Sequence, residues 1–249
     1  MPYLDHAGAA LPSEQQLREV YELARSIPLA NPHSHHSTAT TTHLMVENAR
    51  LRCVHGGRFA SFFFFMVLEH FDVTNEQYAV VFTANATHAL QLVADCFIFG
   101  ENTSPALGIG SVAQHAGPTF AYMRDSHNSV VGMREIVKER VNNILCLDNI
   151  EDQLLAQNGD CRGPAATEHG LFAMTAMSNF CGRKYDLSVV EHLQQRGWSI
   201  CLDAASLVSS SPLSLAEVRP HFVAISFYKM FGYPTGLGAL LIRRMLRIV

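Results

Sequence analysis

From residue 78 onward, short apolar runs alternate with amphipathic stretches that have helical spacing. We predict strands at 78–83, 119–123, 143–147, 171–177, 198–202, 222–227 and 237–242, with helices at 86–98, 129–140 and 188–196. The runs are almost continuously apolar, which is typical of strands buried on both faces. The pattern therefore predicts an α/β fold with a mostly parallel sheet flanked by helices.

The N-terminal part predicts two further helices. The first extends from Ser13 to about Ser26, with Leu17, Val20, Tyr21 and Ala24 on one face. We expect the second to open after a cap region at residues 40–42.

Residues 53–66 interrupt that second helix with a Gly-Gly pair and four consecutive phenylalanines, which match neither a helical nor a strand period. Removing them would join residues 47–52 to 67–71 as one amphipathic helix. We hypothesise that this segment is an insertion, for example a translated retained intron. The alternative is a family-specific hydrophobic loop, and transcript sequencing distinguishes the two.

Composition narrows the functional classes. The chain has 249 residues and 48% apolar content, enough for a core, and its net charge of -4 does not favour nucleic acid as a partner. The longest apolar runs fall far short of the roughly 20 residues of a membrane span. The N-terminus is polar and carries no signal peptide pattern. We expect a soluble cytoplasmic protein.

Six scattered cysteines, without C-x-x-C spacing, predict reduced and mostly buried thiols. His33, His35, His36 and His43 lie close in sequence, but they adjoin a Ser/Thr run that is typical of a loop and a helix cap. We expect no metal site.

Residues suited to ligand binding, through a side chain or a backbone N–H group, follow the predicted strands, at the sheet edge where ligands of such folds bind. They are Ala86 and Thr87 at a helix N-terminus, His127, Asn179, Asp203, Ser226 and Lys229. A helix N-terminus suits a phosphate, a carboxylate can keep a pyridine nitrogen protonated, and a desolvated lysine can form a Schiff base. Each residue has an ordinary explanation alone, such as a helix cap or a lysine beside a turn, but together they favour pyridoxal 5'-phosphate.

The chain resembles the class V aminotransferase-like family of pyridoxal phosphate enzymes, in particular its cysteine desulfurase group. Within that group it is most similar to the branch that transfers sulfur to molybdenum cofactor. The resemblance lies in residues 3–8, 31–34, 82–87, 125–134, 178–182, 202–205 and 226–236, and thus spans nearly the whole chain. It implies the pyridoxal-phosphate-dependent transferase type I fold, a homodimer, and desulfuration of L-cysteine with sulfuration of molybdenum cofactor.

The resemblance also implies roles for single residues. Lys229 would be the Schiff-base lysine and proton shuttle, Asp203 would pair with the pyridinium, and His127 would stack on the ring. Asn179 would reach the phenolic oxygen, and Ala86, Thr87 and Ser226 would hold the phosphate. Tyr228 and Ser206 stand where many desulfurases have histidine and glutamine, which leaves the contacts there open.

The resemblance further implies that the small domain, the persulfide-forming cysteine and the C-terminal cofactor-binding region lie beyond Val249. We therefore expect the chain to be a partial domain, and we expect Cys181, although it is near Asn179, to be a packing residue. Two other functions stay open at this point. One is a different class V lyase or transaminase, and the other is a non-catalytic truncated product.

Overall fold

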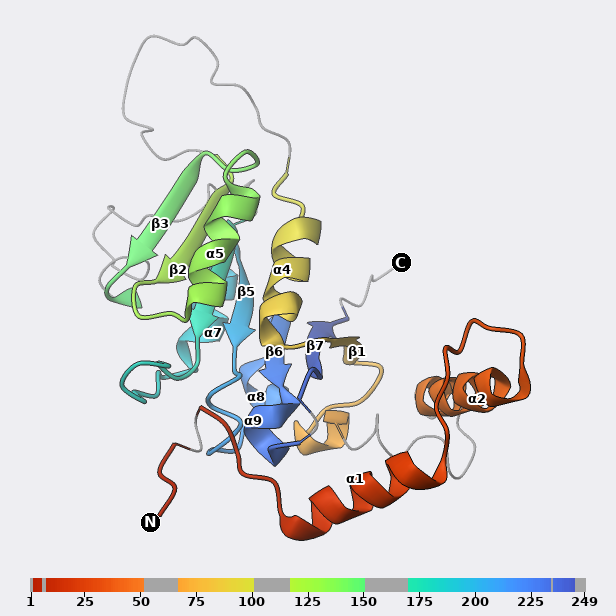
Figure 1. Cartoon of the computed structure of the whole chain (residues 1–249). Helices are drawn as coiled ribbons and strands as arrows, with labels where there is room; N and C mark the ends of the chain where they lie inside the picture. The colour runs from red at the N-terminus through yellow and green to blue at the C-terminus, as the bar shows by residue number, and fades with distance from the viewer. Residues whose placement is uncertain are drawn as a thin grey trace, which may run out of the picture.

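The structure is a computed structural model that describes residues 2–5, 8–51, 67–100, 117–150, 170–233 and 235–244. Its centre is a seven-stranded sheet with the order β1-β7-β6-β5-β4-β2-β3 (Figure 1). The strands are β1 (Tyr78–Thr83), β2 (Thr119–Met123), β3 (Asn143–Leu147), β4 (Gly170–Thr175), β5 (Trp198–Asp203), β6 (Phe222–Ser226) and β7 (Gly238–Arg243). All seven lie where the apolar runs predicted them, with ends that differ by at most two residues.

The predicted parallel character is also confirmed. Neighbouring strands from β3 through β2, β4 and β5 to β6 pair in parallel, whereas β7 is antiparallel to both β6 and β1. Because β1 and β6 are both antiparallel to β7, they point in the same direction. The carboxyl ends of β1, β2, β4, β5 and β6 therefore meet at one edge of the sheet, which is the edge that carries the site.

Helices cover both faces of the sheet. On one face, α4 (Ala86–Cys96) and α5 (Asn128–Val137) pack together over one apolar cluster. On the other face, α7 (Val189–Gln195), the short α8 (Leu215–Val218) and residues 67–73 pack over a second cluster. The central strands alternate between the clusters: Phe172 and Met174 of β4 join one, and Leu171 and Ala173 join the other. This explains why the strand sequences are almost continuously apolar.

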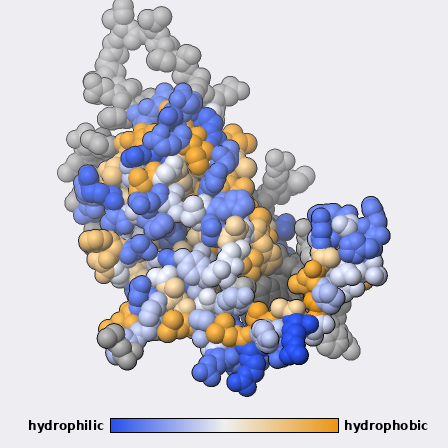
Figure 2. All heavy atoms as spheres, in the orientation of Figure 1, coloured by the Kyte–Doolittle hydropathy of each residue, from blue (hydrophilic) through white to orange (hydrophobic). Residues whose placement is uncertain are grey.

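The first N-terminal helix is confirmed as α1 (Glu14–Ser26). Its N-cap is Ser13, whose side chain accepts a hydrogen bond from the amide of Gln16 at 3.1 Å. No side chain of α1 is buried among the described residues. Figure 1 shows α1 running along the margin of the α/β body, and Figure 2 shows apolar residues interspersed with hydrophilic ones along that lower edge. Leu17 and Tyr21 of the predicted apolar face are exposed.

The start of the second helix was predicted too late. Helix α2 (Ser37–Leu51) begins before the threonines, and the hydroxyls of Thr40, Thr41 and Thr42 donate to carbonyls four residues earlier at 3.0 to 3.3 Å. Threonines that bond back along their own helix lie inside it rather than cap it. The suggested insertion at residues 53–66 lies outside the described residues.

The predicted burial of the cysteines is wrong for most of those that the structure describes. Cys96, Cys146 and Cys181 are exposed, and only Cys201 is buried. Cys181 is thus not a packing residue, and a hydrogen bond with Ser178 is the main reason that its pKa lies below the usual range. Within the described ranges, no helix has the length and apolar character needed to cross a membrane, and no group of three or more potential metal ligands is found.

Candidate active site

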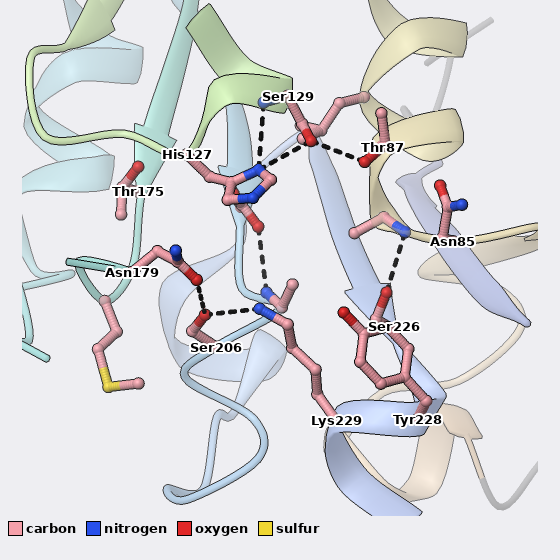
Figure 3. A pocket seen from close by; sticks show the side chains of 15 residues that line it. Asn85, Thr87, His127, Ser129, Thr175, Asn179, Ser206, Ser226, Tyr228 and Lys229 are labelled. Atoms are coloured by element: carbon pink, nitrogen blue, oxygen red, sulfur yellow. Dashed lines mark hydrogen bonds between the residues drawn. The ribbon is translucent and has the colours of Figure 1, made fainter. Parts of the chain in front are cut away.

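A cavity of about 160 Å³ opens at the carboxyl edge of the sheet (Figure 3). It is lined by Asn85, Ala86, Thr87, Leu90, His127, Ser129, Thr175, Met177, Asn179, Asp203, Ala205, Ser206, Ser226, Tyr228 and Lys229. All seven residues that the sequence placed in the site are in this lining, although they come from distant parts of the chain. The structure therefore brings the whole predicted set together.

Lys229 reaches the cavity from α9 (Phe227–Phe231), the short helix that follows β6. The residue is buried, and its Nζ donates a hydrogen bond to Ser206 Oγ at 3.0 Å. Burial lowers the pKa of Lys229, because the charged form loses solvation, while Asp203 and Asp5 oppose the shift. A lysine whose pKa is lowered supplies the neutral amine, which is the form that can act as a nucleophile.

Asp203 ends β5 and is also buried. Its Oδ1 accepts a hydrogen bond from the amide of Ala205 at 3.2 Å. Burial raises the pKa of Asp203, opposed by that hydrogen bond, by Lys229 and by His127. The carboxylate of Asp203 and the amine of Lys229 attract each other, which favours their charged forms. Both pKa shifts nevertheless favour the neutral forms, so desolvation is the larger effect on each group.

The N-terminus of α4 forms the opposite wall. Asn85 is its N-cap and accepts a hydrogen bond from the amide of His88 at 2.9 Å. The amide of Ala86 donates to Ser226 Oγ at 3.1 Å, which joins the helix start to the end of β6. Backbone N–H groups and the positive end of a helix favour a bound anion, and the hydroxyls of Ser226 and Thr87 lie beside them.

His127 stands at the start of α5. Its Nδ1 accepts a hydrogen bond from the amide of Ser129 at 3.1 Å. Ser129 Oγ lies 2.8 Å from the same nitrogen and 2.7 Å from Thr87 Oγ1. Figure 3 shows this chain of contacts linking α5 to α4. The imidazole is held by its Nδ1 edge and is otherwise exposed.

Eight lining residues were not among the predicted site residues, and two of them, Ser129 and Ser206, form hydrogen bonds with predicted ones. Ser129 follows His127 by two positions, and Ser206 follows Asp203 by three. The sequence marked Ser206 only as a departure from the family pattern, and serine at a helix start is so common as a cap that the sequence does not single out Ser129.

The residues fit pyridoxal 5'-phosphate. The start of α4 with Ser226 and Thr87 suits the phosphate, the exposed imidazole of His127 offers a flat surface, and Asp203 offers a buried acid. The amine of Lys229 lies in the same cavity. The donor set thus combines an anion site with an acid and an amine, as a phosphorylated pyridine aldehyde requires.

The chain belongs to the class V aminotransferase family, whose members depend on pyridoxal 5'-phosphate. Residues 67–248 match the family described as "Aminotransferase class-V". The family and the cavity together confirm the predicted cofactor class, while the role of each site residue stays a prediction.

Two curated relatives share one name. A molybdenum cofactor sulfurase of Caenorhabditis elegans is 50% identical over 98% of this chain and 32% of its own length. The Homo sapiens protein of the same name is 39% identical over 96% of this chain and 26% of its own length. The chain thus spans about a third or less of the length of these relatives.

Solved structures confirm the fold. The X-ray structure of a NifS-like protein from Rickettsia africae has a TM-score of 0.64 at 16% identity, over 100% of this chain and 61% of that one. A protein called SspA, solved in complex with cysteine, has a TM-score of 0.64 at 14% identity, over 96% of this chain and 60% of that one. The likeness supports the predicted type I fold of pyridoxal-phosphate-dependent transferases.

Proposed function

We propose that this chain is the pyridoxal-phosphate-binding part of a molybdenum cofactor sulfurase, which removes sulfur from L-cysteine and passes it to molybdenum cofactor. The observation that carries the chemistry is the buried Lys229 facing Asp203 and His127 in one cavity. The relatives named molybdenum cofactor sulfurase support the choice of acceptor.

When bound, pyridoxal phosphate supplies an electron sink for bond cleavage next to the substrate α-carbon. Asp203 provides the buried acid that would hold the pyridine nitrogen in its protonated form. The amides at the start of α4 and the hydroxyl of Ser226 would bind the phosphate, and His127 would cover one ring face. The neutral amine of Lys229 would capture the cofactor and then move the proton of the substrate α-carbon.

Sulfur leaves cysteine when an enzyme thiolate attacks the substrate sulfur. The carbon–sulfur bond breaks, a sulfur–sulfur bond forms, and the carbon takes up a proton, so that cysteine and a thiol give alanine and a persulfide. None of the described cysteines lines the cavity. We therefore propose that the persulfide cysteine, the small domain and the molybdenum cofactor site belong to further parts of the polypeptide. We also propose that the protein is cytoplasmic, forms a homodimer and does not bind nucleic acid.

The test is the visible spectrum of the purified chain with added pyridoxal phosphate, together with alanine formation from L-cysteine. We expect an absorption band that Lys229→Ala abolishes and that Lys184→Ala, a change outside the cavity lining, leaves intact. A band without alanine would favour a different class V lyase or transaminase. No band in the parent chain would mean that this polypeptide is a non-catalytic product.

A further inference from the structure

The hydroxyl of Ser206 contacts two other residues of the site, Lys229 and Asn179. Its Oγ accepts a hydrogen bond from Lys229 Nζ at 3.0 Å and donates one to Asn179 Oδ1 at 3.4 Å (Figure 3). A serine hydroxyl has one proton to donate, so this arrangement uses the proton for Asn179 and a lone pair for Lys229.

The backbone around Ser206 explains how it reaches both partners. The chain leaves β5 at Asp203 and enters a series of turns, in which the amide of Val208 donates to the carbonyl of Ala204 at 3.1 Å. Ser206 is only 6% exposed, and Ser209 Oγ donates to its carbonyl at 2.7 Å. The hydroxyl is thus held at the floor of the cavity between α9 and the loop that follows β4.

We propose that Ser206 is the positioning residue of this site, which aims the amine of Lys229 and orients the amide of Asn179. Since Asn179 Oδ1 accepts from Ser206, its NH₂ group remains available to donate into the cavity. The inference rests on the proposed function, because positioning matters only if the amine and the amide meet a pyridoxal ring. It concerns this chain's own residues, however, and can be tested without cofactor.

The experiment measures the reactivity of Lys229 in the cofactor-free chain. Trace acetylation with acetic anhydride between pH 6 and 11 (~0.5 unit steps), followed by peptide mass spectrometry, gives the apparent pKa of this single amine. Asp203 and Asp5 are the acidic groups that act on it, and they remain unchanged in every variant. The variants are Ser206→Ala, Ser206→Thr, which keeps the hydroxyl, and Ser210→Ala as the matched control, because Ser210 is exposed on the same turn and its hydroxyl contacts the carbonyl of Leu207.

A hydrogen bond to a charged donor stabilises the protonated amine, so its loss should lower the apparent pKa of Lys229. We expect a lowering of about one unit in Ser206→Ala, with little change in Ser206→Thr and Ser210→Ala. If Ser206→Ala does not fold, Ser206→Cys, which offers a weaker acceptor, takes its place. An unchanged pKa in the folded variant overturns the proposal, and so does an equal shift in Ser210→Ala.

A second measurement separates this proposal from the proposed function. The affinity of Ser206→Ala for pyridoxal phosphate, measured from the visible spectrum, should be about fivefold to tenfold lower than that of the parent. Ser206→Thr should restore this affinity. If the parent chain binds no cofactor but the acetylation result holds, the positioning role stands and the proposed function fails. If cofactor binds the parent and Ser206→Ala equally well, the positioning role is refuted and the proposed function stands.

Discussion

Gly238, the first residue of β7, lies where the start of α4, the wall that we propose to bind the phosphate, touches the sheet. A Cβ added at this position would lie 2.7 Å from the carbonyl carbon of Asn85, 2.7 Å from the oxygen of Ile225 and 2.8 Å from the Cα of Asn85. Ordinary van der Waals contact begins at 3.4 Å, and all three neighbours are backbone atoms that cannot rotate away. Gly238→Ala must therefore push the start of α4 away from β6.

Two consequences follow from that displacement. Overpacking against backbone on both sides costs about 1–3 kcal/mol of the free energy of unfolding, which for a chain of this size lowers Tm by roughly 2–4 °C per kcal/mol. The hydrogen bond from the amide of Ala86 to Ser226 Oγ, now 3.1 Å long, would be lost or lengthened. The displaced helix start would also lose a hydrogen bond to the phosphate of a bound cofactor. Since a hydrogen bond to a charged group contributes about 1.5–3 kcal/mol, the affinity for pyridoxal phosphate should fall tenfold or more.

The assay is thermal unfolding followed by pyridoxal phosphate titration, with Gly132→Ala as the matched control. Gly132 lies in α5 with nothing within 4 Å of an added Cβ, so alanine there should stabilise the chain by about 0.5–1 kcal/mol. A Gly238→Ala chain that binds cofactor with unchanged affinity would refute the assignment of this wall to the phosphate. Equal behaviour of the two alanine variants would refute the clash itself.

Two further predictions concern residues outside the cavity. The guanidinium of Arg140 donates to carbonyls at the end of α4, including those of Asp95 at 3.1 Å and Phe97 at 3.2 Å, so Arg140→Gln should lower the free energy of unfolding by about 1–3 kcal/mol, measured by urea denaturation. The same change at the exposed Arg18 should alter the free energy of unfolding little. Equal losses of stability in the two variants would contradict the role of Arg140 as a cap for the end of α4. Burial, together with nearby Arg243, lowers the pKa of His221 to about 4, below its unfolded value of 6.5, so its contribution to stability is present above pH 6.5 and is lost as pH falls toward 4. His221→Gln should reduce the loss of unfolding free energy between pH 6.5 and 4 by as much as about 3 kcal/mol relative to the parent, measured by urea denaturation across this pH range.

The strands and the site edge could be predicted because each rests on one physical rule. Strands covered on both faces must be apolar at every position, so runs such as β4 and β5 stand out in the sequence. Parallel strands bring their carboxyl ends together, so residues as distant as Ala86 and Lys229 could be assigned to one cavity.

Other features depend on information that no local pattern contains. The apolar run of β7 has the same appearance whichever way it points, so its antiparallel pairing with β1 and β6 was not foreseen. Ser129 and Ser206 act through hydrogen bonds set by side-chain rotamers and by the approach of two elements. The start of α2 was misplaced because threonine serves both as a cap and as a residue that bonds back to its own helix.

The burial of Asp203 and Lys229 at the floor of the cavity is better explained by ligand binding than by stability. Asp203 and Lys229 are each less than a tenth exposed, and the pKa of each shifts toward the neutral form, so folding loses solvation energy that their mutual attraction does not restore. Apolar residues of similar volume would serve the surrounding core as well or better. The loss of solvation at Asp203 and Lys229 has an explanation if a bound ligand adds a cationic ring nitrogen beside Asp203 and an electrophilic carbon beside Lys229. The same ligand must be anionic at its other end, because the start of α4 lies across the cavity, and pyridoxal phosphate combines all three features.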